Sequence, residues 1–312
     1  MARTVRLLDV DDATASELRG LWARAADTDG VGAVSEAFRL AVGPARDGIV
    51  HLLRLGDDDG LVGYAQVAEA GTPDAVAELV VDPHDRRQGH GRALLDAALD
   101  DGTRSVWAHG LLPAADALAR AAGLEMTRSL HRMTRPLTDA DAVDPPMPQG
   151  FSVRSFEPGR DDETWVRLNA AAFATHPEQG RLTVADLHER MGQPWFDAAG
   201  FLLVVEDATG AVVAFHWTKT EPGSETGRAH GSGPNAVRSG TGEVYVVGVD
   251  PAHQGRGLGG PLTALGLAHL ARRGLAEVEL YVDGDNTAAR RTYQRLGFTD
   301  AAVDGQYTLR TT

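Results

Sequence analysis

The chain has 312 residues and a formal net charge of −14, which allows about two domains and argues against a nucleic-acid surface, since such a surface must neutralise phosphates. It contains no cysteine, which excludes disulfides, thiolate metal sites and a cysteine acyl-enzyme. The acidic start "MARTVRLLDVDDATA" and the lack of a long apolar run predict no signal peptide, no membrane segment and a cytoplasmic protein.

The first half contains patterns for helices, a hairpin and one further strand. In chain order these are a helix over 13–27, a helical segment over 32–40, hairpin strands over 48–55 and 60–70, a strand over 75–82 and a helix over 92–102. The segment 135–150 follows, rich in proline and acids, and we interpret it as a linker.

The second half repeats this order with insertions. The patterns predict helices over 162–174 and 183–191, a hairpin over 201–219, a strand over 243–250, a helix over 261–274, a strand over 277–283, a helix over 286–297 and a last strand near Tyr307. A polar, glycine-rich segment over 221–242 is expected to be a surface loop, with a lid over a site as the alternative.

A glycine-rich turn occurs once in each half. "VVDPHDRRQGHG" spans 80–91 and "VGVDPAHQGRGLGG" spans 247–260, and both contain the pattern Gln/Arg-x-x-Gly-x-Gly after a valine-rich strand. A later match, "RAAGLEM" with "QRLGFTD", supports a duplicated domain rather than a short solenoid repeat. We therefore predict domains at 1–138 and 151–312, joined by a linker at 139–150.

The chemistry of this turn points to an anion. The first N–H groups of a helix have no intrahelical partner, the helix dipole favours negative charge there, and glycine lets a ligand approach closely. A pyrophosphate is therefore the expected ligand, with tight strand–helix packing as the alternative. The spacing matches neither the Rossmann fingerprint nor a P-loop.

These residues resemble the GNAT acetyltransferases, in which a Gln/Arg-x-x-Gly-x-Gly/Ala turn holds the pyrophosphate of acetyl-CoA. The strings "HPEQGR", "PWFD", "FHWTK", "GEVYVVGVDP" and "LYVDGDNTAA" extend the resemblance to tandem-domain members. It implies an α/β fold with an α+β mixed sheet in each of two tandem GNAT domains. It also implies an N-acetyltransferase that moves acetyl from acetyl-CoA to the cysteinyl amine of 1D-myo-inositol 2-(L-cysteinylamino)-2-deoxy-glucopyranoside, giving mycothiol.

The resemblance assigns acetyl-CoA to segments in both halves. They comprise Leu79, Val80, Val81, Arg87, Gln88, Gly89, His90, Gly91, Arg92, Val247, Gly248, Val249, Gln254, Gly255, Arg256, Gly257, Leu258, Gly259, Gly260, Asn286, Thr287, Ala288, Ala289, Arg290 and Arg291. Backbone N–H groups over 247–249 are expected to meet the pantetheine arm if their strand separates from its neighbour, as it does in the family.

Acyl transfer to an amine needs a base for the amine proton and a donor for the departing thiolate. Glu243, which opens the strand leading to the second turn, is predicted to be the base; the alternative is a carboxylate in solvent. Tyr293, seven residues after Asn286 in the family's late helical segment, is predicted to be the acid; the alternative is an ordinary half-buried aromatic.

The resemblance also implies contacts to the acceptor from Glu36, Glu178, Lys219, Glu243 and Tyr281. Lys219 is the only lysine of the chain, although a lone lysine is usually an unremarkable surface charge. The expected partners are acetyl-CoA and a small-molecule amine, with no nucleic acid, no membrane and no metal, and we expect a monomer.

The two halves are predicted to be unequal. Aligning them on Gly123 and Gly297 puts Leu112 opposite Asn286 and Ala119 opposite Tyr293, so the first copy has lost both groups. The first domain is therefore expected to be non-catalytic and to shape the acceptor pocket. Alternatives for the whole chain are an aminoglycoside or protein N-terminal acetyltransferase and a non-catalytic CoA-binding sensor.

Overall fold

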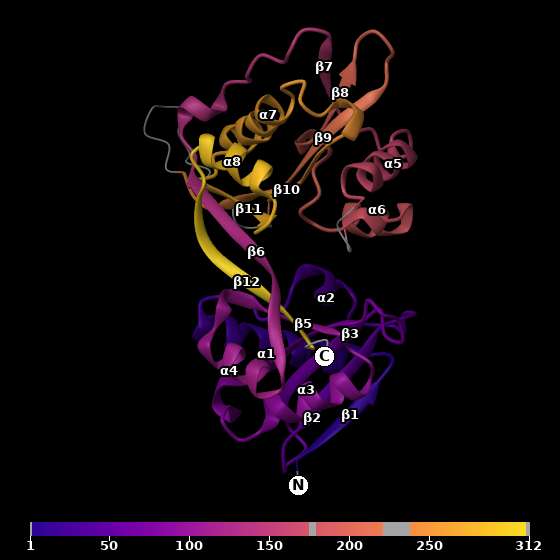
Figure 1. Cartoon of the computed structure of the whole chain (residues 1–312), viewed down its shortest axis with the longest axis vertical. Helices are drawn as coiled ribbons and strands as arrows, with labels where there is room; N and C mark the ends of the chain where they lie inside the picture. The colour runs from indigo at the N-terminus through magenta and orange to yellow at the C-terminus, as the bar shows by residue number, and fades with distance from the viewer. Residues whose placement is uncertain (1, 175–178, 221–237, 310–312) are drawn as a thin grey trace. The chain divides into compact units, whose positions relative to one another are not determined.

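A computed structural model describes residues 2–174, 179–220 and 238–309 (Figure 1). The chain forms two compact units. Unit 1 contains Met1–His131, Asp283–Asp285 and Ala302–Thr312, and unit 2 contains Arg132–Val282 and Asn286–Ala301. Each unit contains a mixed sheet with helices on both faces, which is the α/β class predicted from the sequence.

Unit 1 is built on strands in the order β1-β2-β3-β4-β5-β12. The strands pair antiparallel from β1 to β4, β4 and β5 are parallel, and β5 and β12 are antiparallel. Its elements are β1 (Arg3–Leu7), α1 (Asp12–Asp29), α2 (Glu36–Leu40), β2 (Val50–Leu55), β3 (Leu61–Ala68), β4 (Val76–Val81), α3 (His90–Asp100), β5 (Ser105–Ala108), α4 (Pro113–Ala121) and the start of β6 (Leu124–Pro136).

Two apolar clusters cover the two faces of this sheet. Helix α1 contributes Leu18 and Leu21 to one cluster, and α3 contributes Leu94 and Leu95 to the other. Helix α1 begins where the Asp11 side chain accepts a hydrogen bond from the N–H of Thr14, and it ends at a glycine with a φ of 69°. The predicted amphipathic helices thus form the outer layers of unit 1.

The last strand of the chain, β12 (Thr299–Leu309), completes the sheet of unit 1. Its residues 305–308 pair antiparallel with residues 105–108 of β5. Tyr307 is buried there, and its hydroxyl donates to Asp116 of α4 at 3.1 Å. The predicted domain 151–312 had placed this strand with the second half. The repeat shows that each half ends in a strand, but it does not reveal which sheet receives that strand.

Unit 2 has the strand order β11-β10-β9-β8-β7, antiparallel except for β10 with β11. The predicted linker region begins inside β6, which runs to Pro136, and includes a 3-10 turn over Asp139–Ala142. The other elements are β7 (Phe151–Ser155), α5 (Asp162–Ala172), α6 (Val184–Met191), β8 (Phe201–Glu206), β9 (Val212–Thr220), β10 (Thr241–Val249), α7 (Gly259–Arg272), β11 (Glu277–Asp283) and α8 (Thr287–Arg295).

Helices α5 and α6 pack on one face of the unit 2 sheet, and α7 and α8 pack on the other (Figure 1). The first face is aromatic. Trp165 of α5 meets the rings of Phe201 and Trp217 edge-on. The rings of Phe201 and Trp217 stack with their centroids 4.4 Å apart. Val246 of β10, three residues after Glu243, packs against this aromatic layer. Most of the predicted loop 221–242 lies outside the described residues, so the alternative that it forms a lid stays a prediction.

Candidate functional site

Strands β10 and β11 of unit 2 run parallel for only part of their length. Residues 241–244 of β10 pair with residues 277–280 of β11. β10 then continues to Val249, and its register against β9 shifts just after Val244. The backbone groups of residues 245–249 on the β11 side lie beyond this paired segment and can therefore hydrogen-bond to a ligand. This is the strand separation expected for residues 247–249.

A lysine–glutamate pair lies where the parallel pairing ends. Lys219 of β9 is the cross-strand partner of Glu243, and its Nζ lies 3.8 Å from Oε2 of Glu243. The Lys219 side chain is only 6% exposed and that of Glu243 is 19% exposed. The same Nζ lies 5.1 Å from the ring centroid of Trp195 and 5.5 Å from that of Tyr245, within cation–π range. Lys219 is thus a buried, fixed charge beside the predicted base.

The glycine turn of unit 2 leaves an open surface at the start of α7. Gly255 and Gly257 have φ values of 77° and 79°, where a side chain would be strained, and a Cβ at either would meet nothing within 4 Å. Helix α7 begins at Gly259, so its unpaired N–H groups and the positive end of its dipole face this surface. These features fit a pyrophosphate.

Arg256, between these glycines, already has a carboxylate partner. Its guanidinium donates to Glu206 at 2.9 Å and lies 4.6 Å from the ring centroid of Phe151. The hydrogen bond from Arg256 is the main cause that lowers the pKa of Glu206. A bound pyrophosphate would compete with Glu206 for this guanidinium.

Tyr293 and Asn286 occupy one helix of unit 2. Asn286 caps α8 by accepting a hydrogen bond from the N–H of Ala289 at 3.1 Å. Tyr293 is 8% exposed and belongs to the apolar cluster that includes Val244 of β10. Burial raises the pKa of Tyr293 to about 12, so its phenol keeps its proton at neutral pH. It is therefore a hydrogen-bond donor close to the separating strands, although its role as acid stays a prediction.

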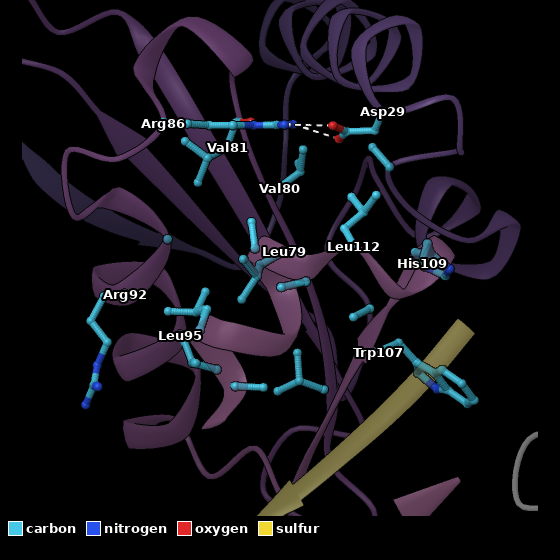
Figure 2. A pocket seen from close by; sticks show the side chains of 18 of the residues that line it. Asp29, Leu79, Val80, Val81, Arg86, Arg92, Leu95, Trp107, His109 and Leu112 are labelled. Atoms are coloured by element: carbon cyan, nitrogen blue, oxygen red, sulfur yellow. Dashed lines mark hydrogen bonds and ion pairs between the residues drawn. The ribbon is translucent and has the colours of Figure 1, made fainter. Parts of the chain in front are cut away.

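Unit 1 has the same strand separation, and a cavity lies in it. Residues 76–78 of β4 pair with residues 105–107 of β5, and β4 then continues to Val81. The cavity has a volume of about 440 Å³, and its walls are mainly apolar (Figure 2). The residues predicted for acetyl-CoA that line it are Leu79, Val80, Val81, Arg87, Gly89, Gly91 and Arg92.

The turn of unit 1 differs in detail from its counterpart. Arg87 stands where unit 2 has Gly255 and adopts a φ of 65°, a conformation that is costly for a residue with a side chain. Arg86 forms a two-point ion pair with Asp29, at 2.7 Å for each bond (Figure 2). Gln88 is exposed and His90 is buried, where its Nδ1 accepts from a neighbouring arginine, and neither lines the cavity.

The groups predicted to be catalytic in unit 2 have no counterparts at the matching positions of unit 1. The cross-strand pairs of the two hairpins can be counted from Val249–Ala214 in unit 2 and from Val81–Gly63 in unit 1. By this count, Lys219 and Glu243 match Ala68 and Val76. Leu112 caps α4 without a side-chain bond, whereas Asn286 caps α8 with one. Leu112 and Ala119, which line the cavity of unit 1, are apolar where unit 2 has Asn286 and Tyr293.

The remaining predicted acceptor contacts are dispersed. Glu36 is the first residue of α2 in unit 1. Tyr281 lies on β11 and is 44% exposed. Glu178 lies outside the described residues. Their roles stay predictions.

The sequence did not point to a partly buried histidine in unit 1. His109 Nδ1 lies 3.0 Å from Asp304 of β12, and its Nε2 lies 3.3 Å from Glu78 of β4. The N–H of Ser35 donates to Glu78, and the N–H of Gly110 donates to Asp304, both at 2.7 Å. Burial by itself lowers the pKa of His109, but the charge of Glu78 and the hydrogen bond with Asp304 outweigh it and raise the pKa to about 10. An imidazolium thus joins the last strand to the sheet.

The described residues contain neither a metal site nor a membrane-spanning helix. Across residues 2–174, 179–220 and 238–309, no group of three or more acidic or histidine side chains could hold a metal ion. In the same part of the chain, the helices are too short or too polar to span a bilayer.

Comparison with known proteins identifies relatives over nearly the whole chain. A family model described as "Acetyltransferase (GNAT) family" matches residues 165–298. The mycothiol acetyltransferase of Streptomyces coelicolor is 49% identical over 92% of this chain and 89% of its own. The mycothiol acetyltransferase of Streptomyces griseus is 47% identical over 98% of this chain and 95% of its own.

Solved structures are similar at lower identity. A tandem GNAT protein from the clavulanic acid biosynthesis pathway has a TM-score of 0.69 at 19% identity and covers all of both chains. A GCN5-related N-acetyltransferase from Sphaerobacter thermophilus has a TM-score of 0.68 at 22% identity, covering 99% of this chain and 96% of its own. These likenesses confirm the fold predicted from the sequence.

Proposed function

We propose that this chain, which belongs to the mycothiol acetyltransferase family of tandem GNAT N-acetyltransferases, transfers acetyl from acetyl-CoA to the cysteinyl amine of 1D-myo-inositol 2-(L-cysteinylamino)-2-deoxy-glucopyranoside, giving mycothiol. The observation that carries the proposal is the position of Glu243. It lies at the point where β10 leaves β11, beside the strand segment that can accept the pantetheine arm.

In the proposed reaction the amine nitrogen attacks the thioester carbonyl carbon, and the C–S bond breaks. Glu243 takes the amine proton directly or through a water molecule. Backbone N–H groups over 247–249 polarise the carbonyl oxygen. Tyr293 donates a hydrogen bond to the departing thiolate; burial raises the pKa of this phenol to about 12, so at neutral pH it is a protonated donor.

Unit 2 is proposed to bind the reacting acetyl-CoA. The glycines of the turn, Gly255 and Gly257, leave room for the pyrophosphate, and the start of α7 supplies N–H donors. Unit 1 is proposed to keep a cavity at the matching place without performing chemistry, because Val76 and Ala68 stand where unit 2 has its glutamate and lysine. Glu36, Glu178, Lys219 and Tyr281 are proposed to contact the acceptor.

The test is acetyl-CoA consumption with the cysteinyl pseudodisaccharide, compared under the same conditions with aminoglycosides and with peptides that have a free N-terminus. The proposal predicts the highest kcat/KM for the pseudodisaccharide. A higher kcat/KM for an aminoglycoside or a peptide would replace the proposed acceptor. Binding of acetyl-CoA without turnover of any amine would favour a sensor.

A further inference from the structure

Lys219 has an environment that a contact to the acceptor alone does not require. It is the only lysine among 30 basic side chains. Its ammonium lies 5.1 Å from the ring centroid of Trp195 and 5.5 Å from that of Tyr245, and 3.8 Å from the carboxylate of Glu243. Those two rings are themselves fixed, since their centroids lie 4.9 Å apart and the Tyr245 hydroxyl accepts from Arg190 at 3.0 Å.

The lysine and the glutamate occur as a pair. They face each other across β9 and β10, and the matching cross-strand pair in unit 1 is Ala68 with Val76. The copy without the glutamate is therefore also without the lysine.

A cation beside a general base has a specific consequence for an amine substrate. An α-amino group has a pKa of about 8, so at neutral pH most of it is ammonium, which cannot attack a thioester. An uncompensated carboxylate in a partly buried site would hold this ammonium as an ion pair and favour the unreactive form. A fixed positive charge nearby opposes that effect, as in sites where one cation activates a neighbouring amine.

Resting on the proposed function, we infer that Lys219 is a positioning residue for Glu243. Its ammonium holds the carboxylate at the end of the paired segment and balances its charge, so that the acceptor amine binds in its neutral form. Lys219 thus acts on the chemical step through Glu243, in addition to any contact with the acceptor.

The test is a double-mutant cycle of Lys219→Met and Glu243→Gln, with kcat and KM measured for each variant. In the wild-type background, Lys219→Met should lower kcat by about 10- to 100-fold, a part of what a general base contributes, besides any rise in the KM of the acceptor from the lost contact. In the Glu243→Gln background, the same change should cost less than about threefold, because the two residues act as a unit.

A chemical control isolates the charge. Because the chain has no cysteine, Lys219→Cys can be alkylated alone in urea and refolded. Alkylation with 2-bromoethylamine restores an ammonium, whereas 2-iodoethanol leaves a neutral chain of the same length. The aminoethyl form should recover most of the lost kcat, and the hydroxyethyl form should not. This comparison also serves if Lys219→Met fails to fold, since the two forms differ only at the terminal group.

Three results would overturn the role of Lys219: an equal loss of kcat in both backgrounds, a raised acceptor KM with normal kcat, or equal recovery by the two alkylated forms. Each variant is measured with an amine that the wild-type enzyme acetylates. Failure of the wild-type enzyme with the pseudodisaccharide would contradict the proposed function alone, because the cycle can be completed with another acceptor.

Discussion

The partly buried imidazolium of unit 1 leads to a prediction about stability. His109 is placed between Glu78 of β4 and Asp304 of β12, with a pKa raised to about 10 from an ordinary value of 6.5. A group with a raised pKa in the folded state stabilises the fold fully below its unfolded pKa, and this contribution is lost as the pH rises through the folded pKa. The stability supplied by His109 should therefore decline between about pH 6.5 and pH 10.

The magnitude follows from the pKa difference. Each pH unit in that window corresponds to about 1.4 kcal/mol of unfolding free energy, which gives an upper limit of about 5 kcal/mol for the whole window. Between pH 6.5 and pH 9, the wild-type protein should lose about 3 kcal/mol more than His109→Gln, which cannot become charged. At pH 6.5 the variant itself should be less stable by about 3–5 kcal/mol, because the two buried carboxylates lose their cation.

The assay is urea unfolding followed by circular dichroism at both pH values, together with an NMR titration of the His109 ring. His84→Gln serves as the control, because His84 lies in the same unit and is exposed. It should keep the pH dependence of the wild-type protein. A ring that titrates near pH 6.5, or an unfolding profile of His109→Gln parallel to that of the wild type, would refute the reasoning.

Two further predictions concern catalysis. Gly257→Trp and Gly89→Trp form a matched pair, since both glycines have a positive φ and open space at the Cβ. Gly257→Trp should lower turnover by about 100-fold or more. Gly89→Trp should keep turnover per folded molecule within about threefold. Equal inactivity of the two folded variants would assign unit 1 a part in turnover. Tyr293→Phe should lower kcat by about 10- to 1,000-fold with a nearly normal acceptor KM, and a kcat within twofold of the wild type would leave Tyr293 as a core residue only.

Local patterns predicted the elements that carry the site. The valine-rich run over residues 243–249 predicted β10, and the turn with Gly255 and Gly257 was placed correctly before α7. The alignment of Leu112 with Asn286 also agrees with the structure, since Leu112 is the N-cap of α4 and Asn286 is the N-cap of the equivalent helix α8. These features depend on neighbours in the sequence, so a single chain contains the information for them.

Features that depend on distant segments were not predictable in the same way. The pairing of β12 with β5 joins residues about two hundred positions apart, and neither strand pattern identifies its partner. The imidazolium of His109 depends on that pairing, because Asp304 lies on β12. The burial of Lys219 depends on Trp195, which lies in an irregular segment between α6 and β8. The string "PWFD" contained this tryptophan, but its spacing to Lys219 has no periodicity that would bring them together.

The most direct test of the central claim is the single-turnover rate of acetyl transfer to the cysteinyl pseudodisaccharide by the wild-type enzyme and by Glu243→Gln, measured across pH. The substitution keeps the shape of the side chain and removes the base. We expect a chemical step slower by about two to four powers of ten, with acetyl-CoA affinity nearly unchanged. A single-turnover rate equal to that of the wild type at every pH would remove Glu243 from the mechanism and contradict the account.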